Sequence, residues 1–106
     1  MIPSLEELRS QCRIDVDDAT DDALLTLYAG AARGKAEKYL NLPLFDESVP
    51  EDADKGMVVN DGVKLAIMLA VGHWYENREQ TREGQLSEIP MGFFSLLDDY
   101  RWGPGT

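Results

Sequence analysis

The most apolar stretch of the chain spans residues 63–75 and predicts a helix at the centre of the fold. No residue from Leu65 to Val71 is polar, so every side of such a helix would be apolar, which is typical of a central buried helix or of a membrane span. The stretch is too short to cross about 30 Å of hydrocarbon, and Lys64 and Glu76 bound it closely. It therefore predicts the core helix of a small soluble protein, which other helices of the chain must cover.

Two helices are predicted before the core helix. A short one follows Ser4, which stands three residues before Glu7, the spacing of a capping box. A long one begins at Thr20 or Asp21 and ends over residues 41–43. Its apolar stripe has steps of three and four residues: Leu25, Ala29, Ala32, Ala36, Tyr39 and Leu40. Three further residues widen the stripe in the first half: Leu24, Leu27 and Tyr28. The connection between these helices should be extended over residues 13–18, where Ile14 and Val16 alternate with polar neighbours.

We expect Asp61 to cap the core helix, with Gly62 in its first turn. The last helix begins at Ile89 and Pro90, with proline at the favoured first helical position. Its apolar positions follow the helical period: Phe93, Leu96, Leu97 and Tyr100. The predicted fold is all-α, a small bundle of three main helices plus a short N-terminal helix. We expect one domain over residues 1–106, with a flexible tail at 102–106.

A long acidic loop is predicted between the first long helix and the core helix, over residues 46–60. Its carboxylates are Asp46, Glu47, Glu51, Asp52 and Asp54. Connections of this length are usually functional or disordered. The order of ligands in an EF-hand is absent, so a solvated loop is the simpler interpretation. Residues 57–59 could add a short strand, most easily by pairing with another chain.

Gly30 and Gly34 lie one helical turn apart in the first long helix. Each glycine costs about 1 kcal/mol against alanine in a helix interior unless a neighbour approaches the backbone closely. They indicate either a groove for another helix or tolerated surface glycines. Trp74 and Tyr75 point about 100° apart on the core helix, so one is expected to pack inward and the other to meet a second element. Arg78, one turn after Trp74, could stack on that ring or pair with a carboxylate.

The charge excludes several classes of function. Twenty Asp and Glu against ten Lys and Arg give a net charge of -10 and a pI near 4.3. This balance argues against a nucleic-acid-binding module and against attraction to an anionic membrane. Cys12 is the one cysteine, so no intramolecular disulfide forms and a reducing cytoplasmic origin fits. The first residues lack the basic start and apolar segment of a signal peptide.

Catalytic and metal-binding patterns are weak. His73 is the one histidine, near the end of the core helix, where a histidine commonly packs or interacts with terminal carbonyls. Cys12 has no basic cluster near it in the sequence to lower its pKa. One histidine and one cysteine cannot form the usual zinc set, and phosphate-binding glycine loops are absent. We therefore expect no enzyme, no metal and no cofactor.

The core helix resembles a known family. Residues 63–79, read VKLAIMLAVGHWYENRE, are similar to the signature helix of the head–tail connector (adaptor) family of long-tailed bacteriophages. Residues 88–93 and 96–101 resemble the closing helix of that family at the expected distance. Residues 21–42 resemble its opening helix more loosely, and the acidic loop matches a variable region.

The resemblance implies a structural virion protein without catalysis or cofactor. Members of the family assemble as a ring, usually of twelve copies, beneath the portal protein. The ring extends the DNA channel and supports the stopper or tail-completion protein. The implied location is the head–tail junction of the virion, after synthesis in the host cytoplasm. DNA would pass through the channel without specific binding.

Three surfaces are expected to serve this role. The subunit interface would join the first-helix glycines to the outer side of the core helix, through Gly30, Gly34, Trp74, Tyr75 and Arg78. The channel lining would be the acidic loop, through Asp46, Glu47, Glu51, Asp52 and Asp54, because like charge keeps DNA from sticking. The portal contact would be the C-terminal end, through Tyr100, Arg101 and Trp102. A frayed end with Trp102 folded back on the core is the alternative.

A second class of function stays open at this point. An acidic helical regulator, such as a DNA mimic that inhibits a basic partner, would space its carboxylates like phosphates on one face and act as a monomer or dimer. A third and weaker option is an enzyme that uses Asp or Glu with an added metal. Size in solution with and without portal protein separates the first two, and loss of activity with a chelator would reveal the third.

Overall fold

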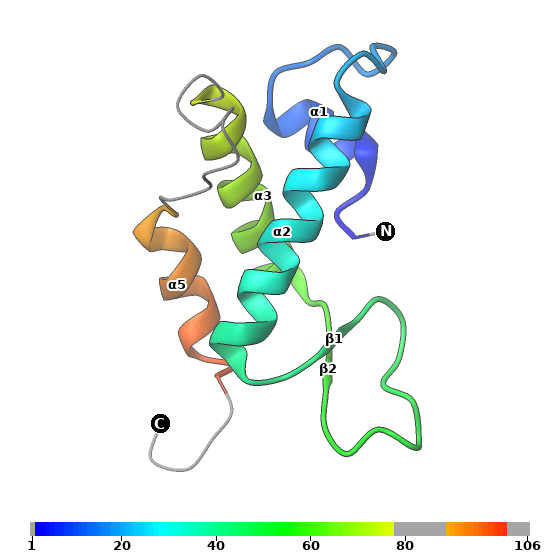
Figure 1. Cartoon of the computed structure of the whole chain (residues 1–106), viewed down its shortest axis with the longest axis vertical. Helices are drawn as coiled ribbons and strands as arrows, with labels where there is room; N and C mark the ends of the chain where they lie inside the picture. Colours follow the sequence, from blue (N-terminus) through cyan, green and yellow to red (C-terminus); the bar gives the residue numbers. More distant parts are fainter. Residues whose placement is uncertain (1, 78–88, 102–106) are drawn as a thin grey trace.

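The computed structural model describes residues 2–77 and 89–101 and is a small, mostly helical bundle (Figure 1). Its helices are α1 (Leu5–Gln11), α2 (Asp22–Leu40), α3 (Asp61–Glu76) and α5 (Met91–Asp98), and its strands are β1 (Leu44–Phe45) and β2 (Met57–Val58). Helix α3 packs against α2, α5 and α1. The predicted all-α bundle with a short N-terminal helix is therefore confirmed. Among the described residues, no helix is both long and apolar enough to span a membrane.

The predicted capping box of α1 is present. The Glu7 amide donates to Ser4 Oγ at 3.2 Å, and the Ser4 amide donates to Glu7 Oε1 at 2.9 Å. These bonds satisfy two of the amide groups that a helix N-terminus leaves without intrahelical partners. Helix α2 also ends where predicted, because Asn41 adopts the left-handed conformation with φ of 59° and closes the helix.

The core lies between α3 and the two helices that pack most extensively on it, α2 and α5, with α1 at one edge. The expected stripe of α2 is buried except for Tyr39, which is half-buried, and Tyr28 is buried as well. Leu27 does not widen the buried stripe as expected, because it is 65% exposed on the outer side of α2. The buried residues of α3 are Val63, Ala66, Ile67, Ala70, Val71 and Trp74.

Helix α3 differs from the sequence expectation in two ways. Asn60, not Asp61, caps it: the Asn60 backbone is extended and its side chain accepts from the Val63 amide at 2.9 Å. Asp61 is already the first helical residue and is exposed. The helix is also not buried on all sides, since Leu65 is 45% exposed on the face opposite α2. Its apolar sequence therefore exceeds what this one copy covers.

Three further expectations need correction. Residues 57–58 pair with residues 44–45 of the same chain, in a parallel register of Leu44 with Met57 and Phe45 with Val58, rather than with another chain. Turns at 12–13 and 16–17 interrupt the segment 13–18, which was expected to be extended: Arg13 has φ of 59°, and the Asp18 amide donates to the Asp15 carbonyl at 2.9 Å. Pro90 stands at the N-cap of α5, one position before the expected one.

Candidate interaction surfaces

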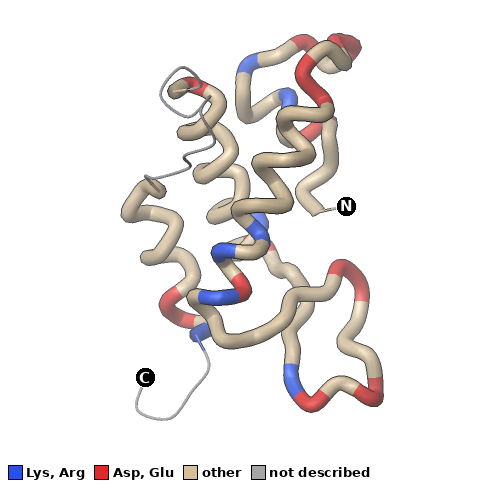
Figure 2. Tube along the Cα trace, in the orientation of Figure 1, with Lys and Arg blue, Asp and Glu red and all other residues tan. Residues whose placement is uncertain are grey.

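The acidic loop projects from one end of the bundle as a closed loop (Figures 1 and 2). The parallel pairing of β1 with β2 closes its base, with Met57 N–H bound to the Pro43 carbonyl at 3.0 Å and Val59 N–H to the Phe45 carbonyl at 2.9 Å. Four of the five predicted loop carboxylates are exposed: Glu47, Glu51, Asp52 and Asp54. Negative charge is thus spread along the outer part of the loop (Figure 2).

The fifth carboxylate, Asp46, lies at the base of the loop and binds α2. Arg33 donates to Asp46 Oδ1 at 2.5 Å and to the Leu44 carbonyl at 2.7 Å. Its guanidinium hydrogen bond holds the pKa of the Asp46 carboxyl below its usual value. The Glu37 carboxylate also accepts from the Leu44 amide at 2.8 Å. Two side chains of α2 therefore anchor the start of the loop, and Asp46 acts in this anchor.

The glycine pair lies on the open side of α2. Gly30 and Gly34 are exposed, and a Cβ built on either would meet nothing within 4 Å. No helix of the same copy approaches them in the described part of the chain. Leu27 lies on the same side, one turn before Gly30. The outer side of α2 is therefore a smooth surface with one exposed leucine.

The aromatic pair of α3 separates as expected. Trp74 is 1% exposed and packs on the Tyr28 ring, with 5.8 Å between ring centroids. Tyr75 is half-buried and its hydroxyl donates to Asp21 Oδ2 at 2.5 Å. This bond uses the Asp21 carboxylate, which makes no capping bond to α2. Trp74 and Tyr75 thus hold α3 against α2, and Arg78 lies outside the described residues.

The C-terminal end of α5 is attached to the last turn of α2. The Tyr39 hydroxyl bonds to the Asp98 carboxylate, which raises the pKa of Tyr39. The Arg101 guanidinium lies 4.9 Å from the centroid of the Tyr39 ring. Tyr100 is exposed in part, and its hydroxyl lies close to Gly62. The structure thus brings Tyr100 near the start of α3 and Arg101 near the end of α2. Trp102 lies outside the described residues.

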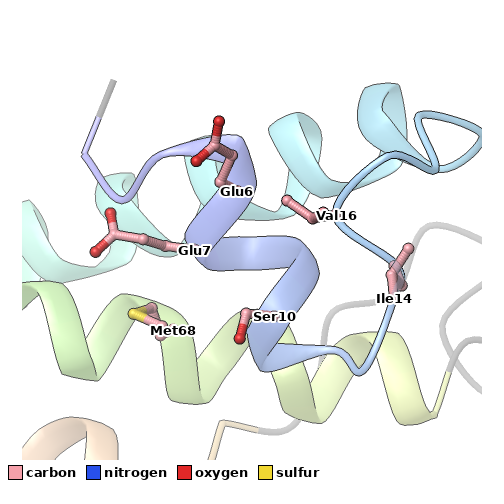
Figure 3. A pocket seen from close by; sticks show the side chains of 6 residues that line it. All are labelled: Glu6, Glu7, Ser10, Ile14, Val16 and Met68. Atoms are coloured by element: carbon pink, nitrogen blue, oxygen red, sulfur yellow. The ribbon is translucent and has the colours of Figure 1, made fainter.

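A groove that sequence reasoning did not find lies between α1, the connection after it, and α3 (Figure 3). Its volume is about 470 Å³, and it is lined by Glu6, Glu7, Ser10, Ile14, Val16 and Met68. The Glu7 carboxylate binds the Lys64 ammonium, which lowers the pKa of Glu7. No sequence signal marks this groove, because it depends on turns at residues 13–18 that contacts with α1 and α2 impose.

The described residues were also compared with what a metal site or a catalytic site requires. The described residues contain no group of three or more His, Cys, Asp and Glu side chains that could hold a metal ion. His73 is half-buried in the last turn of α3, and its carbonyl accepts from the Asn77 amide at 3.1 Å. Cys12 is the C-cap residue of α1 and packs against the core. These positions fit structural roles for both side chains.

Nearly the whole chain matches the model of a known family. The family model described as "Phage gp6-like head-tail connector protein" matches residues 2–101. The match covers nearly the whole chain, including all the described helices and the acidic loop. Comparisons with curated proteins and with solved structures find no match.

Proposed function

Because the chain belongs to the phage gp6-like head–tail connector family, we propose that its copies form a closed ring beneath the portal protein, which extends the DNA channel and supports the tail-completion protein. The family places the chain among structural proteins of the virion at the head–tail junction. The observation that carries the proposal is the family match over residues 2–101. The ring, its channel and the two contacts are the proposed part.

Exposed apolar side chains on opposite sides of the bundle support a ring. Leu27 lies on the outer side of α2, whereas Leu65 lies on the face of α3 that points away from α2. One copy therefore presents an exposed leucine on each of two different helices. Contact between unlike surfaces of identical subunits is heterologous, and it gives a closed ring when the rotation between neighbours closes.

The acidic loop is the proposed lining of the channel. Its outer carboxylates are exposed and its base is fixed to α2 by Arg33. Repeated around a ring, these charges would face the phosphates of the duplex with the same sign, which disfavours adhesion. Asp46 contributes less to this field than the other four carboxylates, since Arg33 neutralises it locally.

The C-terminal end is the proposed portal contact. Tyr100 and Arg101 follow directly after α5, and both are exposed. Aromatic and arginine side chains are enriched at the centres of protein interfaces. The Arg101 guanidinium lies over the Tyr39 ring, and Tyr100 is its neighbour in the sequence, so both side chains are offered to the portal protein from the same end of α5.

Negative-stain electron microscopy of the purified protein, alone and mixed with its portal protein, tests this proposal. We expect ring-shaped particles, either from the protein alone or on addition of portal protein. Tyr100→Ala with Arg101→Ala should leave the circular dichroism spectrum unchanged and reduce attachment of rings to the portal. A protein that stays monomeric at all concentrations with portal protein present would contradict the ring.

A further inference from the structure

The groove on the α1 side has an acidic end and an apolar end. Glu6 and Glu7 lie toward one end, whereas Ile14 and Val16 lie toward the other (Figure 3). Glu6 is exposed and Val16 is 58% exposed, although both border a concave surface. Met68 of α3 lies beside Glu7 at the acidic end, and Ser10 lies between the two ends. Lys64 already binds Glu7, so a complementary partner needs a protruding apolar side chain at one end and a cation for Glu6 at the other.

The outer side of α2 has the opposite pattern. Leu27 protrudes in its first half, Gly30 and Gly34 follow without side chains, and Lys35 and Lys38 are exposed in its second half. Every exposed residue of α2 is either uncharged or basic, in a chain whose net charge is -10. From Leu27 to Lys35 the helix rises by about 12 Å. This surface thus offers a leucine and, along nearly the same line of the helix, Lys38, with Gly30 and Gly34 between them; Lys35 lies about 80° round the helix from Leu27.

We propose that the outer side of α2 docks into the α1–α3 groove of a neighbouring copy of this chain, with Leu27 beside Ile14 and Val16 and the lysines beside Glu6. This inference rests on the ring proposed above and names its interface. Because α2 packs its buried face on α3, its outer side points away from the groove, so the two surfaces lie on opposite sides of one copy. In Figure 3 the pale cyan α2 passes behind α1.

The direction of α2 agrees with this docking. Asp22, at the start of α2, binds Arg9, which also binds the Val16 carbonyl, so the N-terminal end of α2 lies beside the apolar end of the groove of the same copy. Neighbours in a ring of many subunits differ by a small rotation, so the α2 of a neighbour runs nearly parallel to this one. A parallel α2 brings its leucine to the apolar end and its lysines to the acidic end.

The groove exists before docking, which lowers the cost of association. Arg9 donates to both oxygens of the Asp22 carboxylate, at 2.9 and 2.5 Å, and to the Val16 carbonyl at 2.7 Å. The Ile14 amide donates to the Arg9 carbonyl at 2.8 Å. One arginine thus fixes the connection that forms the apolar end, and little ordering remains to oppose binding.

Two variants that each block one surface test the docking. Leu27→Asp blocks the α2 surface, and Val16→Asp blocks the groove; both side chains are mostly exposed, so the folded monomer should be retained. We expect each variant alone to associate at least about tenfold more weakly than the native protein in sedimentation, with portal protein present if the native protein requires it. A mixture of the two should form dimers, because each variant retains the surface that the other lacks.

Met91→Asp is the matched control, because Met91 is 85% exposed on α5, outside both surfaces. It should assemble like the native protein. A second arm uses charge: Glu6→Lys should weaken association even though it lowers the net negative charge and with it the general repulsion between copies. Glu51→Lys, with the same change of charge in the acidic loop, should not weaken it.

The outcomes separate this interface from the ring itself. If the native protein forms rings and both Leu27→Asp and Val16→Asp still do so, the docking is wrong and the ring uses other surfaces. If both variants fail to assemble but their mixture gives no dimer, the two surfaces do not bind each other and the docking is also wrong. If the native protein never forms rings with portal protein, the ring and the docking fail together.

Discussion

At the residue scale, a few ion pairs hold segments that the apolar core does not reach. Arg9 joins α1 to the first turn of α2 through a bidentate pair with Asp22, and Arg33 joins α2 to the acidic loop through Asp46. An ion pair with bidentate geometry contributes more to the stability of the fold than a single exposed pair does. These pairs decide where the connections lie, and the groove and the loop depend on those positions.

Asp22 is expected to make stability depend on pH. The Arg9 hydrogen bond lowers the pKa of Asp22 in the folded state. A lowered folded pKa gives stability that is present above the unfolded value, near 4, and is lost as the pH falls through the folded pKa. Asp22→Asn should therefore be less stable than the native protein at pH 7, and the difference should shrink toward zero below about pH 4.

Urea unfolding at a series of pH values measures this difference. Asp17→Asn, at an exposed residue of the same connection, is the control and should run parallel to the native protein over the whole range. A difference between the native protein and Asp22→Asn that stays constant from pH 7 to pH 3 would show that the Arg9 pair does not contribute through ionisation of Asp22.

Trp74 is expected to be the most costly aromatic residue to truncate. Its side chain is fully buried against Tyr28, so Trp74→Ala should lower the free energy of unfolding by about 3–5 kcal/mol. Leu27→Ala, on the exposed side of α2, should change the stability of the monomer by less than about 0.5 kcal/mol. Chemical denaturation of dilute protein compares them, and similar losses for both would contradict the assignment of Trp74 to the core.

At the element scale, the sequence predicted each helix, because helical periodicity and end signals agree locally. The Ser4 capping box and the stop at Asn41 are both where the sequence places them. The errors involve choices that neighbours decide: Asn60 and Asp61 can both cap a helix, and only the extended conformation of Asn60 selects it. The partner of β2 was equally undetermined, because a two-residue strand carries no information on what it pairs with.

The surfaces were less predictable than the helices. The exposure of Gly30 and Gly34 agrees with either interpretation of the glycine pair, so the sequence could not choose between them. The groove was not foreseen because it arises from the Arg9 contacts with Asp22 and the Val16 carbonyl. Contacts between segments far apart in the sequence leave no periodic signal.

Two glycines are expected to respond oppositely to alanine. At Gly56 a Cβ would lie 2.6 Å from Phe45 Cε2, and φ is 157°, so Gly56→Ala should cost about 1–3 kcal/mol locally. At Gly34 a Cβ meets nothing, so Gly34→Ala should stabilise the monomer by up to about 1 kcal/mol. Hydrogen exchange of the Val59 amide, which closes the loop base, reports the first effect, and thermal unfolding reports the second.

The exchange rate of the Val59 amide in Gly56→Ala tests whether the Phe45 ring packs closely on Gly56. Faster exchange in Gly56→Ala would agree with close packing of the Phe45 ring on the loop backbone. Unchanged exchange would contradict that packing, since the ring could then move aside at no cost to the β1–β2 pairing.

At the scale of the whole molecule, the distribution of apolar and charged surface fits a subunit more than a monomer. Helix α3 is more apolar than one copy can cover, and α2 has an exposed leucine beside bare backbone. The acidic loop lies at the end of the bundle away from α1 (Figures 1 and 2). The surfaces proposed for contact between copies are thus separate from the acidic loop, which agrees with a ring around a duplex.

Neutralising the outer loop is expected to slow the passage of DNA. Glu51→Gln with Asp52→Asn removes two exposed charges from the loop, so the repulsion that keeps DNA from the wall should fall. Virions with this pair should eject DNA more slowly in a fluorescence ejection assay, and the four-residue neutralisation that includes Glu47 and Asp54 should be slower still. Asp15→Asn with Asp17→Asn is the charge-matched control. Equal rates of DNA ejection in all these virions would contradict the proposal that the loop lines the channel.

The most direct measurement is a cryo-electron microscopy reconstruction of the head–tail junction of the virion. The account predicts a ring between the portal and the tail, into which this helical bundle fits with α2 of each copy against the α1 side of the next and the acidic loops facing the central channel. A junction in which the portal contacts the tail directly, or in which this chain is present but not arranged around the channel, would contradict it.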